Sequence, residues 1–297
     1  MKIISTIQQM HEYAVRRRHD GDRIGFVPTM GFLHEGHLSL IRKAREENHT
    51  LVTSIFVNPT QFGPTEDLES YPRDMERDAA LCRDSGVDVL FAPSAEQMYP
   101  DGFCTTVHVA GLTDVLCGRS RPGHFDGVTT VVVKLFSIVR PHRTYFGLKD
   151  YQQYLVIRRM ARDLDLDLEV IGLPIVREDD GLAMSSRNTY LSTEERVSAL
   201  SLNRSLDAAK RMVASGIRDT KTIEARVRSI IEEEPHTRVD YVQVVNAQDL
   251  TPMDHMEEDA LLALAVSVGG AKLIDNAILQ TGKSEKPLMD SLRHNQN

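Results

Sequence analysis

The chain has 297 residues, of which 41% are hydrophobic and 26% charged, and its formal net charge is −8. This length allows a sizeable core in one or two domains. The chain is acidic and its basic clusters are short, such as Arg16–Arg18, so it does not resemble a nucleic-acid-binding protein. The three cysteines have neither disulfide-framework nor zinc-knuckle spacing, and no apolar run approaches membrane-spanning or signal-peptide character. We therefore expect a soluble, cytoplasmic protein.

Strand-like and helix-like segments alternate along the first part of the chain. Short buried strands are expected at Ile24–Val27, Leu51–Val57, Val87–Phe91, Thr144–Phe146 and Leu168–Leu173. Helices are expected at Leu38–Ala44, Asp74–Ser85, Val128–Val139 and Asp150–Asp163. Val128–Val139 is rich in β-branched residues, but its apolar positions follow helical spacing, so we interpret it as a buried helix. This alternation predicts an α/β fold, a Rossmann-like doubly wound parallel sheet.

The pattern changes towards the C-terminal part of the chain. Helical patterns at Glu194–Ser215 and Thr220–Glu234 precede two strand-like segments, Val239–Val245 and Leu261–Val268. Helices followed by strands predict a smaller C-terminal α+β domain. We therefore divide the chain into a domain at residues 1–176, a second domain at 177–283 and a mobile tail at 284–297.

Two histidines, His34 and His37, lie between the first expected strand and the helix that follows it. A helix N-terminus at such a turn binds phosphate, because its first N–H groups have no partner and carry partial positive charge. A nucleotide is therefore the expected substrate. Two alternatives stay open at this point. Zinc would need His-Glu-x-x-His, with the ligands four apart instead of three, and a plain turn with two solvated histidines needs no ligand.

Other polar residues follow the later strands. Asn58 and Gln61 follow the second strand, and Lys149 and Asp150 follow the fourth. Ligands in parallel sheets bind at the carboxyl ends of the strands, so this topology would bring these residues to one edge. The amides of Asn58 and Gln61 suit a small hydroxylated substrate, or they belong to a plain turn. Lys149 suits a phosphate, or it is a surface lysine beside a helix cap at Asp150.

Three further segments have residue types suited to phosphate or substrate binding. Gly147 permits close approach of the backbone to a ligand, and Gln153 offers both a donor and an acceptor. The loop Met184–Arg187 carries two hydroxyls and a guanidinium, which suit a triphosphate but also occur in interdomain turns. The basic segment Arg119–Phe125 either closes over phosphates or caps a helix.

Taken together, these motifs resemble the pantothenate synthetase (pantoate–β-alanine ligase) family, within the nucleotidyltransferase superfamily marked by a His-x-Gly-His turn. The resemblance extends from about Gly25 to Gln280, and the ordered set is much more specific than the turn alone. Its motifs are Pro28–Gly31, His34–His37, Phe56–Phe62, Tyr71–Arg73, Gly147–Gln153 and Gly181–Arg187.

The resemblance implies an ATP-dependent, AMP-forming ligase. It would condense (R)-pantoate with β-alanine through a pantoyl-adenylate intermediate to give pantothenate. ATP would be a substrate, with Mg²⁺ bound mainly through the phosphates and few protein ligands. The family also implies a homodimer whose partners are small molecules, with no nucleic acid and no membrane. Residues 1–176 would bind nucleotide and pantoate, and the small domain at 177–283 would act as a lid.

The resemblance also implies the roles of individual residues. His37 would be the proton donor, assisted by His34 and Lys149; Gln61 and Gln153 would bind pantoate, and Gln61 also β-alanine. The implied ATP-binding residues are Met30, Gly31, Phe32, Leu33, His34, Glu35, Gly36, His37, Gly147, Leu148, Lys149, Asp150, Val176, Met184, Ser185, Ser186 and Arg187. Family members commonly carry Glu where this chain has Leu148, so we predict that the Leu148 side chain points away from the ligand.

Two other functions share the histidine turn. A different nucleotidyltransferase acting on tRNA is disfavoured by the acidic balance of the chain. A nucleotide sensor without catalysis is disfavoured because every implied catalytic position is filled.

Overall fold

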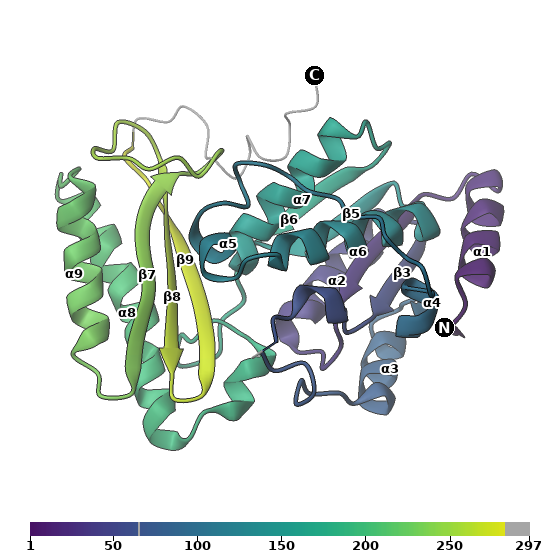
Figure 1. Cartoon of the computed structure of the whole chain (residues 1–297), viewed down its shortest axis with the longest axis horizontal. Helices are drawn as coiled ribbons and strands as arrows, with labels where there is room; N and C mark the ends of the chain where they lie inside the picture. The colour runs from purple at the N-terminus through teal and green to yellow at the C-terminus, as the bar shows by residue number, and fades with distance from the viewer. Residues whose placement is uncertain (65, 283–297) are drawn as a thin grey trace. The chain divides into compact units, whose positions relative to one another are not determined.

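The structure is a computed structural model that describes residues 1–64 and 66–282 (Figure 1). Within this part, the chain forms two compact units. The first unit comprises Met1–Asp114, Arg121–Leu148 and Gln153–Pro174, and the second comprises Val115–Ser120, Lys149–Gln152 and the described chain from Ile175 onward. The mobile tail expected at 284–297 lies outside the described residues.

The first unit contains a parallel sheet, which confirms the predicted α/β fold. Its strand order is β1-β4-β3-β2-β5-β6, and each neighbouring pair is parallel. The strands are β1 (Lys2–Ile4), β2 (Ile24–Thr29), β3 (Thr50–Ile55), β4 (Val89–Phe91), β5 (Arg143–Gly147) and β6 (Glu169–Leu173). The short strand β1 was not predicted, because three residues carry no measurable periodicity.

Helices pack against both faces of this sheet. They are α1 (Ile7–His19), α2 (Glu35–Glu47), α3 (Met75–Asp84), α4 (Ala95–Met98), α6 (His124–Val139) and α7 (Tyr151–Asp163). Val27 of β2 belongs to a core cluster with Ile41 of α2 and Cys82 of α3. Its neighbour Phe26 contacts Phe136 of α6, with ring centroids 6.4 Å apart. Successive strand residues point to opposite faces, so α2 and α3 cover one face and α6 the other.

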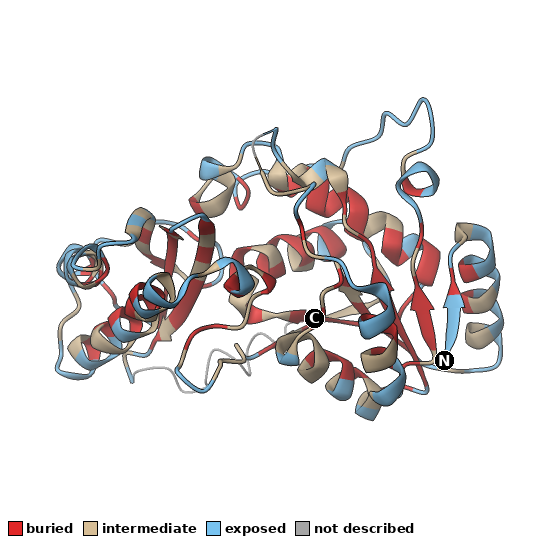
Figure 2. Cartoon of the chain, turned by 90° about the horizontal axis from the view of Figure 1, so that it is seen from below, coloured by how far each residue is buried: buried red, intermediate tan, exposed pale blue. Residues whose placement is uncertain are grey.

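Burial explains why α6 is a helix despite its β-branched residues. In Figure 2 the residues of the strands and the helix faces turned towards them are mostly buried. α6 contains the whole of the predicted helix Val128–Val139, and eleven of its residues are buried. The helical spacing of its apolar residues therefore outweighed their β propensity, because tertiary packing commonly overrides local preference.

The strand order reverses at β2. Although β3 and β4 lie between β2 and β5 in the chain, β2 pairs with β3 on one side and with β5 on the other. All three strands are parallel, so their carboxyl ends, at Thr29, Ile55 and Gly147, meet at one edge of the sheet. Ligands of open parallel sheets bind at such a switch point.

The second unit is built from helices followed by strands, as predicted, and its strands form an antiparallel sheet. Its elements are α5 (Leu116–Ser120), a 3₁₀ turn at Ser186–Tyr190, α8 (Thr193–Ala214), α9 (Thr220–Glu232), β7 (Thr237–Asn246), β8 (Ala260–Val268) and β9 (Ala271–Leu279). The sheet order is β7-β8-β9. Ser192 caps α8: its Oγ accepts from the Glu195 N–H, and the Glu195 carboxylate accepts from the Ser192 N–H. Across residues 1–64 and 66–282, no helix is long and apolar enough to cross a membrane.

Candidate active site

The turn between β2 and α2 has the strand-to-helix geometry that the sequence predicted. Gly31 and Phe32 both have positive φ, +84° and +49°. A Cβ on Gly31 would lie 2.9 Å from Ile55 Cγ2, so both the backbone conformation and the available space require glycine there. The Thr29 hydroxyl accepts a hydrogen bond from the Gly31 N–H at 3.2 Å and donates to the Ser54 carbonyl. The turn is therefore anchored to the end of the neighbouring strand β3.

A buried carboxylate from α3 holds the next two residues of the turn. Asp78 Oδ2 accepts from the Phe32 N–H at 2.6 Å, and Oδ1 accepts from the Leu33 N–H at 2.8 Å. Asp78 is 1% exposed. Burial raises the pKa of the Asp78 carboxyl, although the two N–H donors and Arg77 oppose this shift. The sequence analysis missed Asp78, because a single acidic residue in a polar helix gives no sign of burial.

The two histidines occupy the start of α2. His34 is the N-cap residue, and its backbone N–H donates to His37 Nδ1 at 3.3 Å. The ring centroids of His34 and His37 are 4.1 Å apart. Since His37 Nδ1 accepts a hydrogen bond, the neutral ring carries its proton on Nε2. This tautomer is the one that can donate a proton from Nε2.

The loop after β3 fixes the amide of Gln61. Asn58, which is 1% exposed, donates from Nδ2 to Gln61 Oε1 at 3.0 Å, and its Oδ1 accepts from the Tyr99 hydroxyl at 2.7 Å. Gln61 Nε2 then lies 3.3 Å from Met30 Sδ. The structure thus brings Gln61 next to Met30, as the sheet topology predicted. Tyr99 was missed, because no motif includes it.

The start of α6 packs directly on this loop. A Cβ on Gly127 would lie 2.4 Å from the Thr60 carbonyl oxygen, so only glycine permits this contact. Arg121 donates to both oxygens of Glu66 at 2.6 and 2.5 Å, and His124 Nδ1 lies 2.8 Å from the Gln61 carbonyl oxygen. Burial alone would raise the pKa of the Glu66 carboxyl, but the Arg121 guanidinium outweighs burial and lowers this pKa. Arg121 Nη2 also donates to the Gln61 carbonyl at 3.2 Å, so the Arg121 side chain positions the Gln61 loop.

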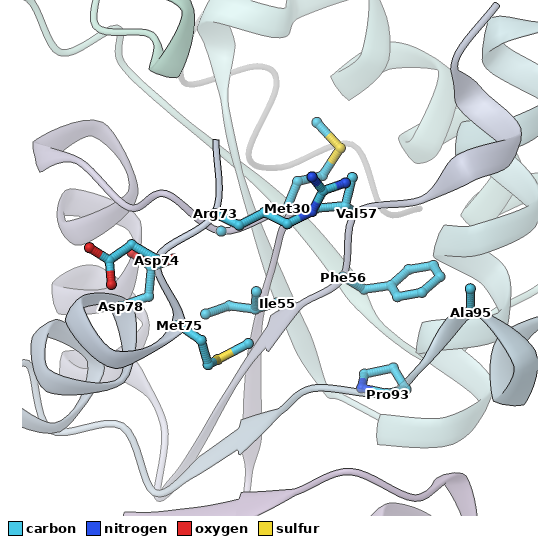
Figure 3. A pocket seen from close by; sticks show the side chains of 11 residues that line it. Met30, Ile55, Phe56, Val57, Arg73, Asp74, Met75, Asp78, Pro93 and Ala95 are labelled. Atoms are coloured by element: carbon cyan, nitrogen blue, oxygen red, sulfur yellow. The ribbon is translucent and has the colours of Figure 1, made fainter. Parts of the chain in front are cut away.

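A cavity of about 300 Å³ lies beside the turn (Figure 3). Apolar side chains of Ile55, Phe56, Met75 and Pro93 line it, and Asp78 belongs to its wall. Met30 and Gly31 of the turn also line this cavity. Asp78 therefore lies between the turn and a mostly apolar space, which is consistent with the raised pKa of its carboxyl.

In the second unit, predicted ATP-binding residues from separate segments lie together. The Met184 N–H donates to the Val176 carbonyl at 3.0 Å, which joins two predicted positions. Ser185 Oγ accepts from the Arg187 N–H at 3.3 Å at the start of the 3₁₀ turn. The Lys149 carbonyl accepts from Asn276 Nδ2 at 2.9 Å. Lys149, Val176 and Met184–Arg187 therefore all belong to this unit.

An ion pair between a half-buried arginine and a buried aspartate holds the loop between Val176 and Met184. Arg177 contacts both oxygens of Asp275, with Nη1–Oδ2 and Nη2–Oδ1 distances of 2.7 and 3.0 Å. Arg177 Nη1 also donates to the Gly181 carbonyl at 3.1 Å. The Asp275 side chain is 1% exposed. The pair was not predicted, since its members are 98 residues apart in the chain.

Further predicted residues of the first unit lie at the end of β5 and after it. Among the described residues, nothing lies within 4 Å of where a Gly147 Cβ would be, so the backbone there is open to close approach. Leu148 is 5% exposed, and a Cβ on Gly172 would lie 2.7 Å from its Cδ2. The Leu148 side chain thus packs inside the first unit; its position relative to ATP stays a prediction. Gln153 is half-buried on α7.

The described part of the chain contains no group of three or more His, Cys, Asp or Glu side chains that could hold a metal ion.

Comparison with known proteins gives matches along most of the chain. The family model for pantoate–β-alanine ligase matches residues 2–278. The pantothenate synthetase of Moorella thermoacetica is 54% identical over 280 residues, covering 94% of this chain and 99% of the relative. That of Thermotoga petrophila is 55% identical over 279 residues, covering 94% and 100%.

Solved structures match at the level of the fold. The pantothenate synthetase of Thermus thermophilus superposes with a TM-score of 0.90 at 47% identity, covering 94% of this chain and 100% of the other. The pantoate–β-alanine ligase of Francisella tularensis, in complex with beta-gamma ATP and β-alanine, gives a TM-score of 0.77 at 35% identity. Here 96% of this chain and 100% of the other are covered.

Proposed function

The chain belongs to the pantoate–β-alanine ligase family, and we propose that it joins pantoate to β-alanine in two steps driven by ATP. The pantoate carboxylate attacks the α-phosphorus of ATP, and pyrophosphate leaves. The β-alanine amine then attacks the acyl carbon of pantoyl adenylate, loses a proton, and AMP leaves as pantothenate forms. The observation that carries this proposal is the pair of histidines at the start of α2, next to the switch point of the sheet.

In the first step a carboxylate must approach a polyanion. The Nε2–H of His37 and the side chain of His34 donate to the α-phosphate without adding a permanent charge. The N–H groups of Glu35 and Gly36 lie in the first turn of α2, where amides have no carbonyl partner within the helix. Lys149 and Arg187 supply the positive charge that reduces repulsion between the reactants.

The amides of Gln61 and Gln153 bind pantoate, and Gln61 also binds β-alanine. Because Asn58 donates to Gln61 Oε1, the Gln61 amide has a fixed orientation with its NH₂ group towards Met30. An amide donor can bind a carboxylate or hydroxyl without repelling it. Holding both reactants in attacking geometry provides a large part of the rate acceleration.

Several features of the proposal come from the family resemblance. Met30–His37, Gly147–Asp150, Val176 and Met184–Arg187 bind ATP, and Mg²⁺ binds mainly through the phosphates. The domain at 177–283 acts as a lid that excludes water from the adenylate formed in the domain at 1–176. The protein acts as a homodimer in the cytoplasm.

The test is pyrophosphate release from ATP and Mg²⁺ with pantoate alone and then with β-alanine. We expect about one equivalent of pyrophosphate with pantoate alone and many turnovers when β-alanine is added. His37→Ala and Lys149→Ala should each lower the first step at least ~10²-fold. His19→Ala, at an exposed histidine at the end of α1, is the matched control and should leave the rate unchanged. No pantoate-dependent release by the unaltered chain would overturn the proposal.

A further inference from the structure

We infer that Asp78 is a positioning residue for the ATP-binding turn. Its buried carboxylate accepts the N–H groups of Phe32 and Leu33 and so holds the turn in the shape that pantoyl-adenylate formation requires. The inference rests on the proposed function. Asp78 lies on α3, outside the motifs in which the sequence resembles the ligase family.

Three consecutive amides of the turn are bonded to the protein itself. The Gly31 N–H donates to Thr29 Oγ1, and those of Phe32 and Leu33 donate to Asp78. Leu33 is 0% exposed, so its N–H could not turn to water if Asp78 were absent. These amides are therefore committed to shaping the turn, so the backbone amides that this segment can offer to a phosphate are those at the start of α2.

A carboxylate suits this position better than any neutral side chain. Two N–H groups arrive together, at 2.6 and 2.8 Å, and each needs its own acceptor oxygen. The nearest cation is Arg77, whose Nη1 lies 3.6 Å from Asp78 Oδ1 and whose side chain is 46% exposed. Besides burial, the like charge of Asp74 raises the pKa of the Asp78 carboxyl. Cys82, on the same helix, has a thiol whose pKa is raised by burial and then by Asp78. The turn amides therefore reduce the cost of burying this charge but do not cancel it, since burial still keeps the pKa of the Asp78 carboxyl above its ordinary value.

Asp78 is not needed to start the helix that carries it. The N-cap of α3 is Asp74, whose Oδ1 accepts from the Arg77 N–H at 3.0 Å. Asp74 also lines the cavity beside the turn, so it shares the surroundings of Asp78 but not its contacts with the turn. This difference makes Asp74→Asn the matched control for Asp78→Asn.

The experiment measures pantoate-dependent pyrophosphate release for the full chain and both variants. Asp78→Asn keeps one acceptor oxygen and places an NH₂ group against the other N–H. We expect kcat to fall about 10²-fold, since small displacements of reacting groups have effects of this size, with a much smaller change in the KM for ATP. Asp74→Asn should stay within about threefold. A folded Asp78→Asn variant as active as Asp74→Asn would overturn the inference.

The pH profile separates positioning from a purely structural role. Protonation of Asp78 turns one of its acceptors into a donor, so the unaltered chain should lose activity towards acid. Asn does not titrate, and the rate ratio between the unaltered chain and Asp78→Asn should therefore shrink as the pH falls. A ratio that is constant with pH would contradict the inference.

A second measurement does not depend on activity or on the folding of the variant. In ¹H–¹⁵N spectra of the unaltered chain, the amide proton shifts of Phe32 and Leu33 should move together in one acid titration. Amides that do not titrate would overturn the inference. If pyrophosphate release is absent but the amides titrate, the proposed function fails while the role of Asp78 in shaping the turn stands.

Discussion

Each unit of the molecule uses a buried aspartate to hold a loop, but the two aspartates are compensated differently. The Asp78 and Asp275 side chains are both 1% exposed. Asp78 accepts from two neutral backbone amides, whereas Asp275 forms a bidentate ion pair with Arg177. One carboxylate thus shapes a backbone turn directly, and the other anchors a charged side chain that in turn holds its loop.

The two aspartates should therefore destabilise the protein under different changes. The burial of Asp78 raises the pKa of its carboxyl, so the charged form destabilises the fold. The turn nevertheless needs that charged form, because both carboxylate oxygens accept its N–H groups. Asp275 has the full opposite charge of Arg177 at 2.7 Å, so stability should fall when that arginine is removed.

Removing the partner of Asp275 should have the largest effect. Arg177→Met leaves a buried carboxylate without its cation, and the free energy of unfolding should fall by about 3–5 kcal/mol in urea titrations. The control is Arg228→Met, at an exposed pair with Glu232 in α9, which should change stability by less than about 0.5 kcal/mol.

Replacing both members of the pair tests the reason for this effect. Arg177→Met combined with Asp275→Leu removes the buried charge together with its partner, and most of the lost stability should return. If the double variant is as unstable as Arg177→Met, then packing of the arginine stem, not its charge, holds the loop.

The turn held by Asp78 should be sensitive to a single added carbon. Gly31→Ala combines a positive φ with a Cβ 2.9 Å from Ile55 Cγ2, so unfolding free energy should fall by about 2–4 kcal/mol and pyrophosphate release with it. Gly21→Ala is the control, because Gly21 has nearly the same φ, +82°, and no described atom within 4 Å of the new Cβ. It should lose only about 1–2 kcal/mol and retain activity. Equal losses of unfolding free energy in the two variants would show that backbone strain alone, without the contact to Ile55, destabilises Gly31→Ala.

The smallest effect is a pH dependence of stability. Burial raises the pKa of the Asp78 carboxyl above its ordinary value of 3.8, so the folded chain binds this proton more tightly than the unfolded chain. The stability contributed by this group is fully present below that value and is lost as the pH rises through the folded pKa. Asp78→Asn should therefore gain stability relative to the unaltered chain as the pH rises from about 4. Chemical denaturation at several pH values would measure this, and a constant difference would contradict it.

Local periodicity was enough to predict most of the elements but not all. The helical spacing of Val128–Val139 correctly predicted α6. Strand β9 was missed because Asp275 and Asn276 interrupt it with residues that are depleted in strands. The structure shows why they are tolerated there. Asp275 pairs with Arg177, and Asn276 donates to the Lys149 carbonyl.

As with the fold, the part of the candidate site that has a local sequence pattern could be predicted, and the rest could not. The turn with His34 was placed correctly between a strand and a helix, because both elements have local periodicity, but α2 begins at Glu35 and so includes His37. The roles of the predicted residues stay predictions. Glu66 and Tyr99, which hold Arg121 and Asn58, gave no signal in the sequence. A hydrogen-bond partner distant in the chain has no local pattern by which to find it.

The fold class, the family and the position of the histidine turn follow from spacing and ordered motifs, which are local properties of the chain. Which carboxylates become buried, and which groups compensate them, depends on tertiary packing. Asp78 reaches amides 45 and 46 residues away, and Asp275 reaches an arginine 98 residues away. Such pairings depend on how the elements pack, since the energy of a buried charge is set by the groups that surround it in space.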